Sequence, residues 1–192
     1  MAFNKSLTIL LLCFVSSLYP IISPDFFIKF PNHYFVETGT YQGNGLLYAL
    51  LANFPEIYSL EIDTELATKA QDLFKSFKNV RIVCGDSSCI LWKVIKDMNQ
   101  SITFWLDAHN SSGTYLDKNT SLLDELEQIK LHHIKTHTII IDDVRLLGTR
   151  EFDFITKETV IQKILEINPR YVITYLDGYC QNDIMVAQVH VN

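Results

Sequence analysis

The sequence predicts an α/β fold in which a mostly parallel sheet of about seven strands carries helices on both faces. From Asp25 onward, short apolar runs alternate with amphipathic segments, and the connections between them are short. The run at residues 136–142 is rich in β-branched residues, which is typical of a strand covered on both faces. There is no internal repeat and no low-complexity segment, so a single domain accounts for the pattern.

The predicted elements follow one another in order along the chain. The first strand begins at Tyr34, and later strands cover residues 57–62, 79–84, 102–107, 136–142, 171–176 and 184–191. Helices are predicted at 46–54, 64–77, 88–98, 121–133 and 156–167. The strand at 184–191 alternates like an edge strand. In the helix at 64–77 we place Thr64 at the N-cap and expect these residues to face the core: Leu66, Ala70, Leu73 and Phe77.

Residues 1–24 have the three-part form of a secretory signal peptide. Basic Lys5 precedes an apolar run at residues 7–15, and Val15 and Ser17 are suited to precede a cleavage point. The run is short for a membrane span and Pro20 interrupts it, so a cleaved signal, an uncleaved membrane anchor and a buried helix all stay open. We expect a secreted, periplasmic or membrane-associated protein if the segment is a signal or an anchor, and a cytoplasmic protein otherwise. Residues 25–192 form the predicted domain.

The balance of charge argues against nucleic acid as a partner. The 16 Lys and Arg residues are outnumbered by 22 Asp and Glu residues, which gives a formal net charge of -6. A surface that follows phosphates needs an excess of basic residues, and this chain lacks one. The cysteines have neither a CxxC spacing nor a zinc pattern, so we expect all four to be small buried hydrophobes: Cys13, Cys84, Cys89 and Cys180.

The stretch from Tyr34 to Gly45 begins as an apolar and aromatic run and ends in three glycines. It predicts a buried strand that enters a tight turn and then a helix, where glycine lets a ligand approach the main chain. The spacing G-x-x-x-G-x-G differs from the dinucleotide fingerprint G-x-G-x-x-G. Glu37, two residues before Gly39, suits a cationic ligand better than a pyrophosphate, because like charges repel. An ordinary glycine-rich turn is the alternative interpretation.

Polar residues follow the next two predicted strands. Glu61 ends the second strand and is placed to accept hydrogen bonds from ribose hydroxyls, with Asp63 as the other candidate. Asp86 and Ser87 follow the third strand, and Asp86 is suited to an adenine amino group. Ligands gather at the carboxyl ends of the strands in an open α/β sheet, so these residues and the glycine turn predict a nucleoside site. The alternative for each is a solvated loop residue.

Three carboxylates follow the fourth and fifth predicted strands. Asp107 and His109 follow the fourth, and Asp142 and Asp143 follow the fifth. These strands are expected near the centre of the sheet, so the carboxylates would repel one another unless a cation lay between them. Mg²⁺ prefers oxygen ligands and keeps waters that a hydroxylated substrate can replace, and His109 could take the hydroxyl proton. The alternative is that an aspartate caps a turn, Arg145 neutralises it and His109 is an ordinary loop residue.

The pattern E-x-G-x-x-x-G at Glu37, Gly39 and Gly43 resembles the first motif of class I S-adenosylmethionine (SAM)-dependent methyltransferases. The later acids resemble, more narrowly, the metal-dependent sugar O-methyltransferases of the macrocin type. The resemblance spans roughly residues 26–191 and implies a Rossmann-like domain whose last strand is antiparallel. It implies a SAM site and an Mg²⁺ site. The SAM site comprises Glu37, Gly39, Thr40, Gly43, Glu61, Asp86, Ser87 and Asp107, and the Mg²⁺ site Asp107, Asp142 and Asp143. The family's base is usually an aspartate two residues after the metal acid, and His109 stands there, so we predict His109 as the catalytic base.

We therefore predict methyl transfer from SAM to a hydroxyl of a small molecule, such as a sugar, with Mg²⁺ assistance. Acceptor selection would fall to the loops at 109–120 and 146–154, to the segment before Glu37, or to a partner subunit in a homo-oligomer. Phe152 and Phe154 in the second loop could stack on a sugar or aryl ring, or belong to the core. The rival functions are an NAD-dependent oxidoreductase and a membrane-tethered SAM-binding module without catalysis.

Overall fold

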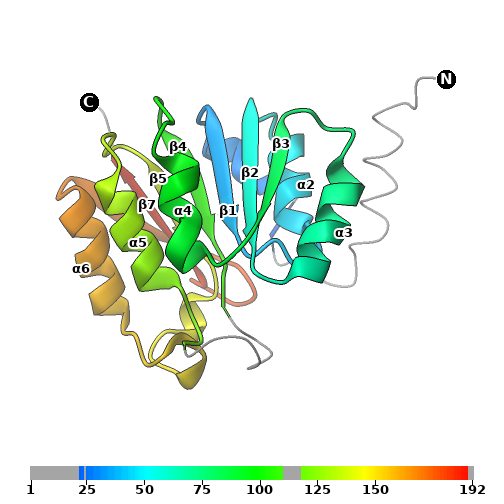
Figure 1. Ribbon diagram of the computed structural model, residues 1–192. Helices are drawn as coiled ribbons and strands as arrows, with labels where there is room; N and C mark the ends of the chain where they lie inside the picture. Colours follow the sequence, from blue (N-terminus) through cyan, green and yellow to red (C-terminus); the bar gives the residue numbers. More distant parts are fainter. Residues whose placement is uncertain (1–21, 24, 110–117, 190–192) are drawn as a thin grey trace.

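The computed structural model of the chain describes residues 22–23, 25–109 and 118–189. At its centre, seven strands form one sheet in the order β3-β2-β1-β4-β5-β7-β6 (Figure 1). Their bounds are β1 (Tyr34–Thr38), β2 (Glu56–Glu61), β3 (Val80–Cys84), β4 (Ile102–Leu106), β5 (Thr138–Ile141), β6 (Tyr171–Leu176) and β7 (Ile184–Val189). Most of the predicted leader and the middle of the predicted loop at 109–120 lie outside the described residues. The predictions about both segments therefore stay predictions.

The direction of the strands agrees with the predicted α/β architecture. Six strands run in one direction, and β7 runs against its neighbours β5 and β6, which confirms the prediction of a last strand that is antiparallel. The prediction that this strand lies at an edge is wrong. It is inserted between β5 and β6 and pairs with both, so its residues Ile184 to Ala187 are buried.

Helices cover both faces of the sheet. One side carries α4 (Ser87–Ile95), α5 (Leu122–Leu131) and α6 (Lys157–Ile167), which lie together in Figure 1. The other side carries η1 (Phe26–Lys29), α2 (Asn44–Leu51) and α3 (Thr64–Phe74). Successive strand residues point to opposite sides, so Val36 packs in the first apolar cluster and Phe35 in the second. Both faces of the sheet therefore contribute to the core.

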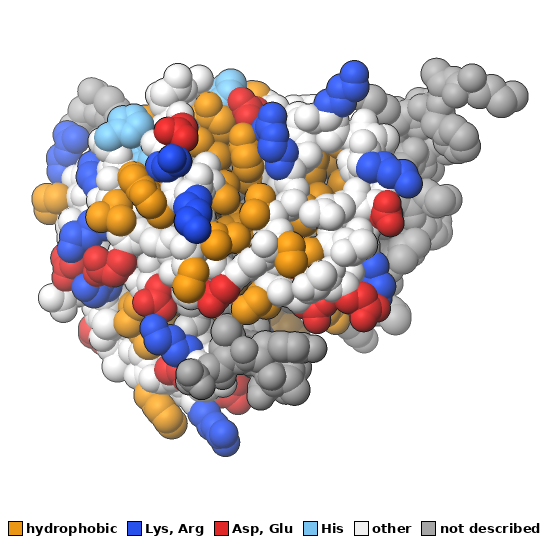
Figure 2. Space-filling view, in the orientation of Figure 1, with side chains coloured by type: hydrophobic (Ala, Val, Ile, Leu, Met, Phe, Trp, Pro, Cys, Tyr) orange, Lys and Arg blue, Asp and Glu red, His pale blue; other side chains and the backbone are white. Residues whose placement is uncertain are grey.

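One part of the first side is less covered. Figure 2 shows hydrophobic side chains gathered on the surface beside α4. On this side of β2 and β3, Tyr58 and Val83 are half-buried, and the guanidinium of Arg81 lies 5.2 Å from the centre of the Tyr58 ring. Arg81 also pairs with Glu56 at 2.9 Å, so a charged side chain partly covers the apolar surface.

The start of α3 differs from the prediction. The N-cap is Asp63 and not Thr64, because the Asp63 carboxylate accepts hydrogen bonds from the amides of Glu65 (2.8 Å) and Leu66 (3.0 Å). The buried face is also rotated from the predicted one. Leu73 is 43% exposed, and the residues that pack inward are Ala67, Ala70, Phe74 and Phe77.

The cysteine prediction is wrong for the three cysteines that can be tested. Cys84, Cys89 and Cys180 are exposed free thiols. Cys84 ends the edge strand β3, Cys89 lies in the first turn of α4, and Cys180 lies between β6 and β7. Cys13 lies outside the described residues. In the described part of the chain, none of the helices has both the length and the apolar character that crossing a bilayer requires.

The strand order places a reversal between β1 and β4. The chain runs outward from β1 to β2 and β3, then returns to form β4 on the other side of β1. β1 and β4 are neighbours, and the connections that follow them lead toward opposite sides of the sheet. Open α/β sheets form their ligand sites between two such connections.

Candidate active site

A cavity of about 580 Å³ opens at the carboxyl ends of β1 to β5. Its wall is lined by residues at the end of β2 and by residues that directly follow β1, β3, β4 and β5. The predicted site residues that line it are Gly39, Glu61, Asp86, Ser87, Asp107, His109, Asp142 and Asp143. Glu37, Thr40 and Gly43 are not among the described residues that line it. The strand ends thus gather most of the predicted residues around one space.

The turn after β1 needs glycine because the chain passes close to its neighbours. Gly39 has φ +83°, and a Cβ atom there would lie 2.6 Å from the backbone oxygen of Asp107. A Cβ atom on Gly45 would lie only 1.8 Å from Oε1 of Glu37. The first glycine lets the ends of β1 and β4 touch, and the second leaves room for a carboxylate beneath the first turn of α2.

Glu37 is buried behind this turn. Its Oε2 accepts a hydrogen bond of 2.5 Å from Ser59 Oγ, and Ser59 Oγ lies 2.6 Å from Thr40 Oγ1. Burial raises the pKa of Glu37 to about 8, although the Ser59 hydrogen bond opposes the shift. Glu37 and Thr40 therefore hold the turn from inside the domain.

Glu61 joins the glycine turn to the end of β2. Its Oε2 accepts from the amide of Tyr41 at 2.8 Å, and its Oε1 accepts from the amide of Asp63 at 2.9 Å. The side chain is buried, yet it borders the cavity. Each carboxylate oxygen keeps a free lone pair for a ligand hydroxyl. Asp63, the other candidate for that role, caps α3 with its carboxylate.

Asp86 and Ser87 begin α4 beside the cavity. Asp86 is the N-cap and accepts from the amide of Ser88 at 2.8 Å, so part of its carboxylate caps the helix. The Ser87 hydroxyl donates to Oε1 of Glu125 at 2.6 Å and is therefore already engaged. Glu125 is buried within α5, and burial raises its pKa. Sequence reasoning missed Glu125, because a single acid on an amphipathic helix carries no signal of its own.

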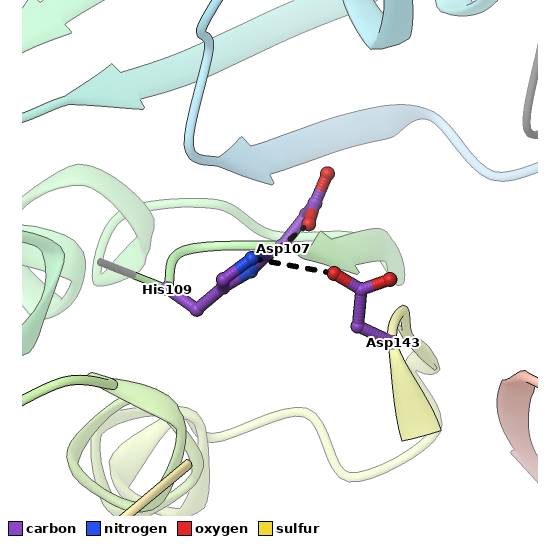
Figure 3. Close-up of side chains that lie close together, drawn as sticks. All are labelled: Asp107, His109 and Asp143. Carbon is purple, nitrogen blue, oxygen red and sulfur yellow. Dashed lines mark ion pairs between the residues drawn. The ribbon is translucent and has the colours of Figure 1, made fainter. Parts of the chain in front are cut away.

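Three side chains converge beyond the ends of β4 and β5 (Figure 3). Nδ1 of His109 lies 3.7 Å from Oδ1 of Asp107, and Nε2 of His109 lies 3.4 Å from Oδ2 of Asp143. Burial raises the pKa of Asp107 well above its usual value, and the charges of Asp142 and Asp143 raise it further. Burial, followed by the charge of Asp143, raises the pKa of Asp142 to about 7. The crowding of carboxylates that the strand order predicts is therefore present.

Arg145 and Asp183 border this cluster. The guanidinium of Arg145 pairs with the carboxylates of both Asp143 and Asp183, so the neutralising contact that we considered for Arg145 exists. Asp183 is fully buried, and its Oδ1 also accepts from the amide of Arg145 at 2.9 Å. Sequence reasoning missed Asp183. It precedes the last strand, and only the insertion of β7 beside β5 brings it to the site.

Of the two phenylalanines in the predicted acceptor loop at 146–154, one lies in the core and one at the surface. Phe152 in η3 (Arg150–Phe152) is buried, with its ring centre 5.6 Å from that of His109, so it belongs to the core beneath the site. Phe154 is 69% exposed. Asp153 accepts hydrogen bonds from the amide (2.9 Å) and the side chain (2.7 Å) of Asn119, which lines the cavity. The two loops are thus joined at the cavity edge.

The arrangement of strands and helices is that of the Rossmann-like class I methyltransferases. The similarity lies in the fold and not in the sequence. No protein-family model matches the chain, and a comparison with curated proteins finds no match.

Solved structures of methyltransferases superpose over nearly the whole chain. A methyltransferase of Podospora anserina bound to S-adenosylhomocysteine (SAH) has a TM-score of 0.60 and 12% identity, covering 100% of this chain and 98% of its own. An O-methyltransferase of Bacillus cereus in complex with SAH has a TM-score of 0.59 and 16% identity, covering 98% and 93%. The O-methyltransferase TomG of Streptomyces achromogenes, involved in tomaymycin synthesis and bound to SAM, has 0.53 and 14%, covering 99% and 82%. At these identities the comparison establishes the fold.

Proposed function

We propose that the protein is a SAM-dependent methyltransferase that methylates a hydroxyl group of a small molecule with the help of a divalent cation. One observation carries the proposal. A single cavity joins the glycine turn after β1 to the carboxylates after β4 and β5. The likeness in fold to proteins solved with SAM or SAH supports the same choice of cofactor.

The residues around the cavity fit SAM. Gly39 presents backbone without a side chain, Glu61 has lone pairs free for the ribose hydroxyls, and Asp86 borders the cavity where an adenine amino group would be bound. The half-buried Asp107 and the buried Asp142 and Asp143 favour a cationic ligand, because a positive charge relieves their mutual repulsion. Bound SAM supplies a methyl group that its sulfonium already makes reactive. Glu37, Thr40, Gly43 and Ser87 would support the cofactor indirectly, by holding the turn and the start of α4.

The donors after β4 and β5 fit a divalent cation. The predicted ligands are Asp107, Asp142 and Asp143, and Mg²⁺ is the first candidate ion, since carboxylate oxygen is its preferred ligand. In the structure these ligands divide into two groups that share Asp143, one with His109 and one with Asp183. A bound cation would lower the pKa of an acceptor hydroxyl. The protein would hold the acceptor at the cavity edge between the two joined loops and leave its proton within reach of His109, the predicted base.

For the acceptor we propose a hydroxylated small molecule, with a sugar as the first class to test. The exposed ring of Phe154 offers an apolar surface beside the loop junction. The negative net charge of the chain argues against nucleic acid as the acceptor. We also retain the N-terminal segment as a proposed signal or membrane anchor, and a homo-oligomer as one way to complete the acceptor pocket.

Calorimetry with SAM, SAH and NAD tests the cofactor. We expect SAM and SAH to bind and NAD not to bind, and a failure of the first two would exclude the methyltransferase. Transfer of a radiolabelled methyl group to a panel of sugars and phenols, with and without Mg²⁺, then tests the reaction. Binding of SAM without transfer to any acceptor would favour the rival of a non-catalytic SAM-binding module. Binding of NAD in place of SAM would favour an oxidoreductase.

A further inference from the structure

Among the described residues, two groups of three side chains at the carboxyl ends of the strands could each surround a metal ion, and Asp143 belongs to both groups. One contains Asp107, His109 and Asp143, and the other contains Asp142, Asp143 and Asp183. Within each group, one ligand atom per residue lies within 4.8 Å of the others. The second group already has a cation, because the Arg145 guanidinium pairs with Asp143 and Asp183. The first group is therefore the one that is left to hold a metal.

The spacing within the first group does not fit hydrogen bonds. The contacts of His109 with Asp143 (3.4 Å) and Asp107 (3.7 Å) both exceed the usual hydrogen-bond length. Two ligand atoms that each lie about 2.1 Å from one ion are about 3.0 Å apart at a right angle and about 4.2 Å apart when opposite. The contact of His109 Nδ1 with Asp107 falls between these limits. The contact with Asp143 is made by the other ring nitrogen, Nε2, and a single ion can bind only one of the two nitrogens. The evidence for a shared centre is therefore that one ligand atom of each residue lies within 4.8 Å of the others (Figure 3).

His109 carries a second, independent sign of an absent ligand. Its Nδ1 atom is buried and has no hydrogen-bond partner among the described residues. A buried polar atom without a partner is costly, and most such atoms in folded proteins are satisfied. The ring is held in place by Phe152, which packs beneath it at 5.6 Å. Packing therefore orients the imidazole, while its Nδ1 atom lacks a hydrogen-bond partner among the described residues.

The carboxylates of this group are held by outer contacts. Oδ1 of Asp142 accepts from the amide of Asp143 at 2.8 Å, which engages Asp142 in positioning its neighbour. Asp143 has φ +56°, a left-handed conformation that aspartate tolerates better than most residues. Its Oδ1 is paired with Arg145, and its Oδ2 faces His109. Such second contacts fix the direction of metal ligands.

We propose that Asp107, His109 and Asp143 bind a divalent first-row transition metal such as Mn²⁺ in preference to Mg²⁺. His109 is then a ligand and not the general base, and Asp142 positions Asp143 without binding the ion directly. Imidazole nitrogen suits transition metals, whereas Mg²⁺ favours a shell of oxygens. The role of the ion in methyl transfer rests on the proposed function, but its binding does not.

Pulsed electron paramagnetic resonance of Mn²⁺ bound to the full 192-residue chain tests the ligand set. We expect ¹⁴N modulation from one coordinated imidazole, and displacement by Mg²⁺ only when Mg²⁺ is in at least roughly 100-fold excess. His109→Gln should remove the modulation and weaken Mn²⁺ binding by at least about tenfold. His33→Gln is the matched control, because His33 lies near Glu56 at the amino ends of the strands, and it should change neither.

Each other outcome decides against the inference. Bound Mn²⁺ without ¹⁴N modulation would mean that carboxylates alone hold the ion and would return His109 to the role of base. Absence of Mn²⁺ binding, or equal affinity for Mg²⁺, would also overturn it. The wild-type spectrum is decisive by itself, so the test does not depend on the variant folding. Calorimetry with SAH in the absence of metal reports separately on the proposed function, and its failure would leave the spectroscopic result standing.

Discussion

Ionisable side chains are buried both where the strands begin and where they end. We call these two sides of the sheet the amino edge and the carboxyl edge. At the amino edge, Nδ1 of His137 accepts from the amide of Ile102 at 3.1 Å, and its Nε2 contacts Nδ1 of His132 at 3.1 Å. Nε2 of His132 in turn contacts the carbonyl oxygen of Ile95 at 3.0 Å. If both imidazoles are neutral and carry the proton on Nε2, each of these three contacts joins a hydrogen-bond donor to an acceptor. Burial lowers the pKa of both histidines, that of His137 to about 3.

At the carboxyl edge, burial brings like charges together. Asp142 and Asp143 raise the cost of ionising Asp107, and Asp143 raises that of ionising Asp142. Among the described residues, Nδ1 of His109 has no hydrogen-bond partner. A complete polar network stabilises the fold, whereas an incomplete one costs stability and is expected where a ligand is bound. This difference is consistent with a structural role for the amino edge and with the proposed ligand site at the carboxyl edge.

The largest expected effect is at the carboxyl edge. Asp143→Asn should lower methyl transfer by roughly 1,000-fold, because one charge of the metal-binding group is lost while asparagine accepts the same backbone conformation. SAH affinity should change by less than about threefold, since the cofactor site is retained. Asp97→Asn, on an exposed residue, is the control. Activity within tenfold of wild type would remove Asp143 from the catalytic site.

A pair of glycine variants separates close contact from backbone strain. Gly39 and Gly148 both have φ +83°, but a Cβ atom on Gly148 would have nothing within 4 Å, whereas one on Gly39 would strike the Asp107 backbone. Gly148→Ala should cost about 1 kcal/mol of unfolding free energy, and Gly39→Ala about 1–3 kcal/mol more. Only Gly39→Ala should weaken SAH binding. Urea denaturation and calorimetry measure the two effects, and equal costs would show that the ends of β1 and β4 are not in tight contact.

At the amino edge, His137→Leu should cost stability and leave the site intact. The amide of Ile102 would lose its acceptor and stay buried, at a cost of about 2–3 kcal/mol. SAH binding should be unchanged, because the network lies at the opposite edge from the cavity. Urea denaturation measures the cost. A loss of SAH binding in a folded variant would show that the two edges are coupled.

The pH dependence of stability should have opposite signs at the two edges. His137 holds fewer protons when folded, so its contribution is lost as pH falls from about 6.5 toward its folded pKa of about 3. Glu37 holds more protons when folded, so its contribution falls as pH rises from its unfolded pKa of about 4.5 toward about 8. Above about pH 6.5 the second effect remains, and the raised pKa values of Asp107, Glu125 and Asp142 act in the same direction, so wild-type protein should lose at least about 1–2 kcal/mol by pH 8.

Glu37→Gln provides the control for this effect. It should reduce the decline above about pH 6.5 by about 1–2 kcal/mol, because glutamine does not titrate and can still accept from Ser59, whereas the other acids with raised pKa values keep the remaining slope. Urea denaturation at pH 6.5, 7.2 and 8.0, in the absence of SAM and metal, measures both proteins. Parallel curves for variant and wild type would contradict the assignment of the slope to Glu37.

Much of the fold was predictable because it depends on local patterns. Alternating strands and helices indicated the α/β sheet, and the rule that ligands gather at strand ends brought Glu61, Asp107 and Asp143 to one cavity. What a side chain bonds to was less predictable. Asp63 and Asp86 cap helices, and Asp183 reaches the site only through the insertion of β7. Such partners are set by distances between segments far apart in the chain, which periodicity does not contain.

The aromatic residues of η1 determine how the domain would respond to force. The Phe27 ring packs against Phe35 at 4.8 Å and Trp105 at 5.3 Å, and Ile22 is buried in the same cluster. Tension applied to the chain upstream of Ile22 would therefore be borne by this cluster before it reached Gly39 at the far end of β1. The domain could be attached by its N-terminus, to a surface or to a fusion partner, without mechanical load on the turn beside the cavity.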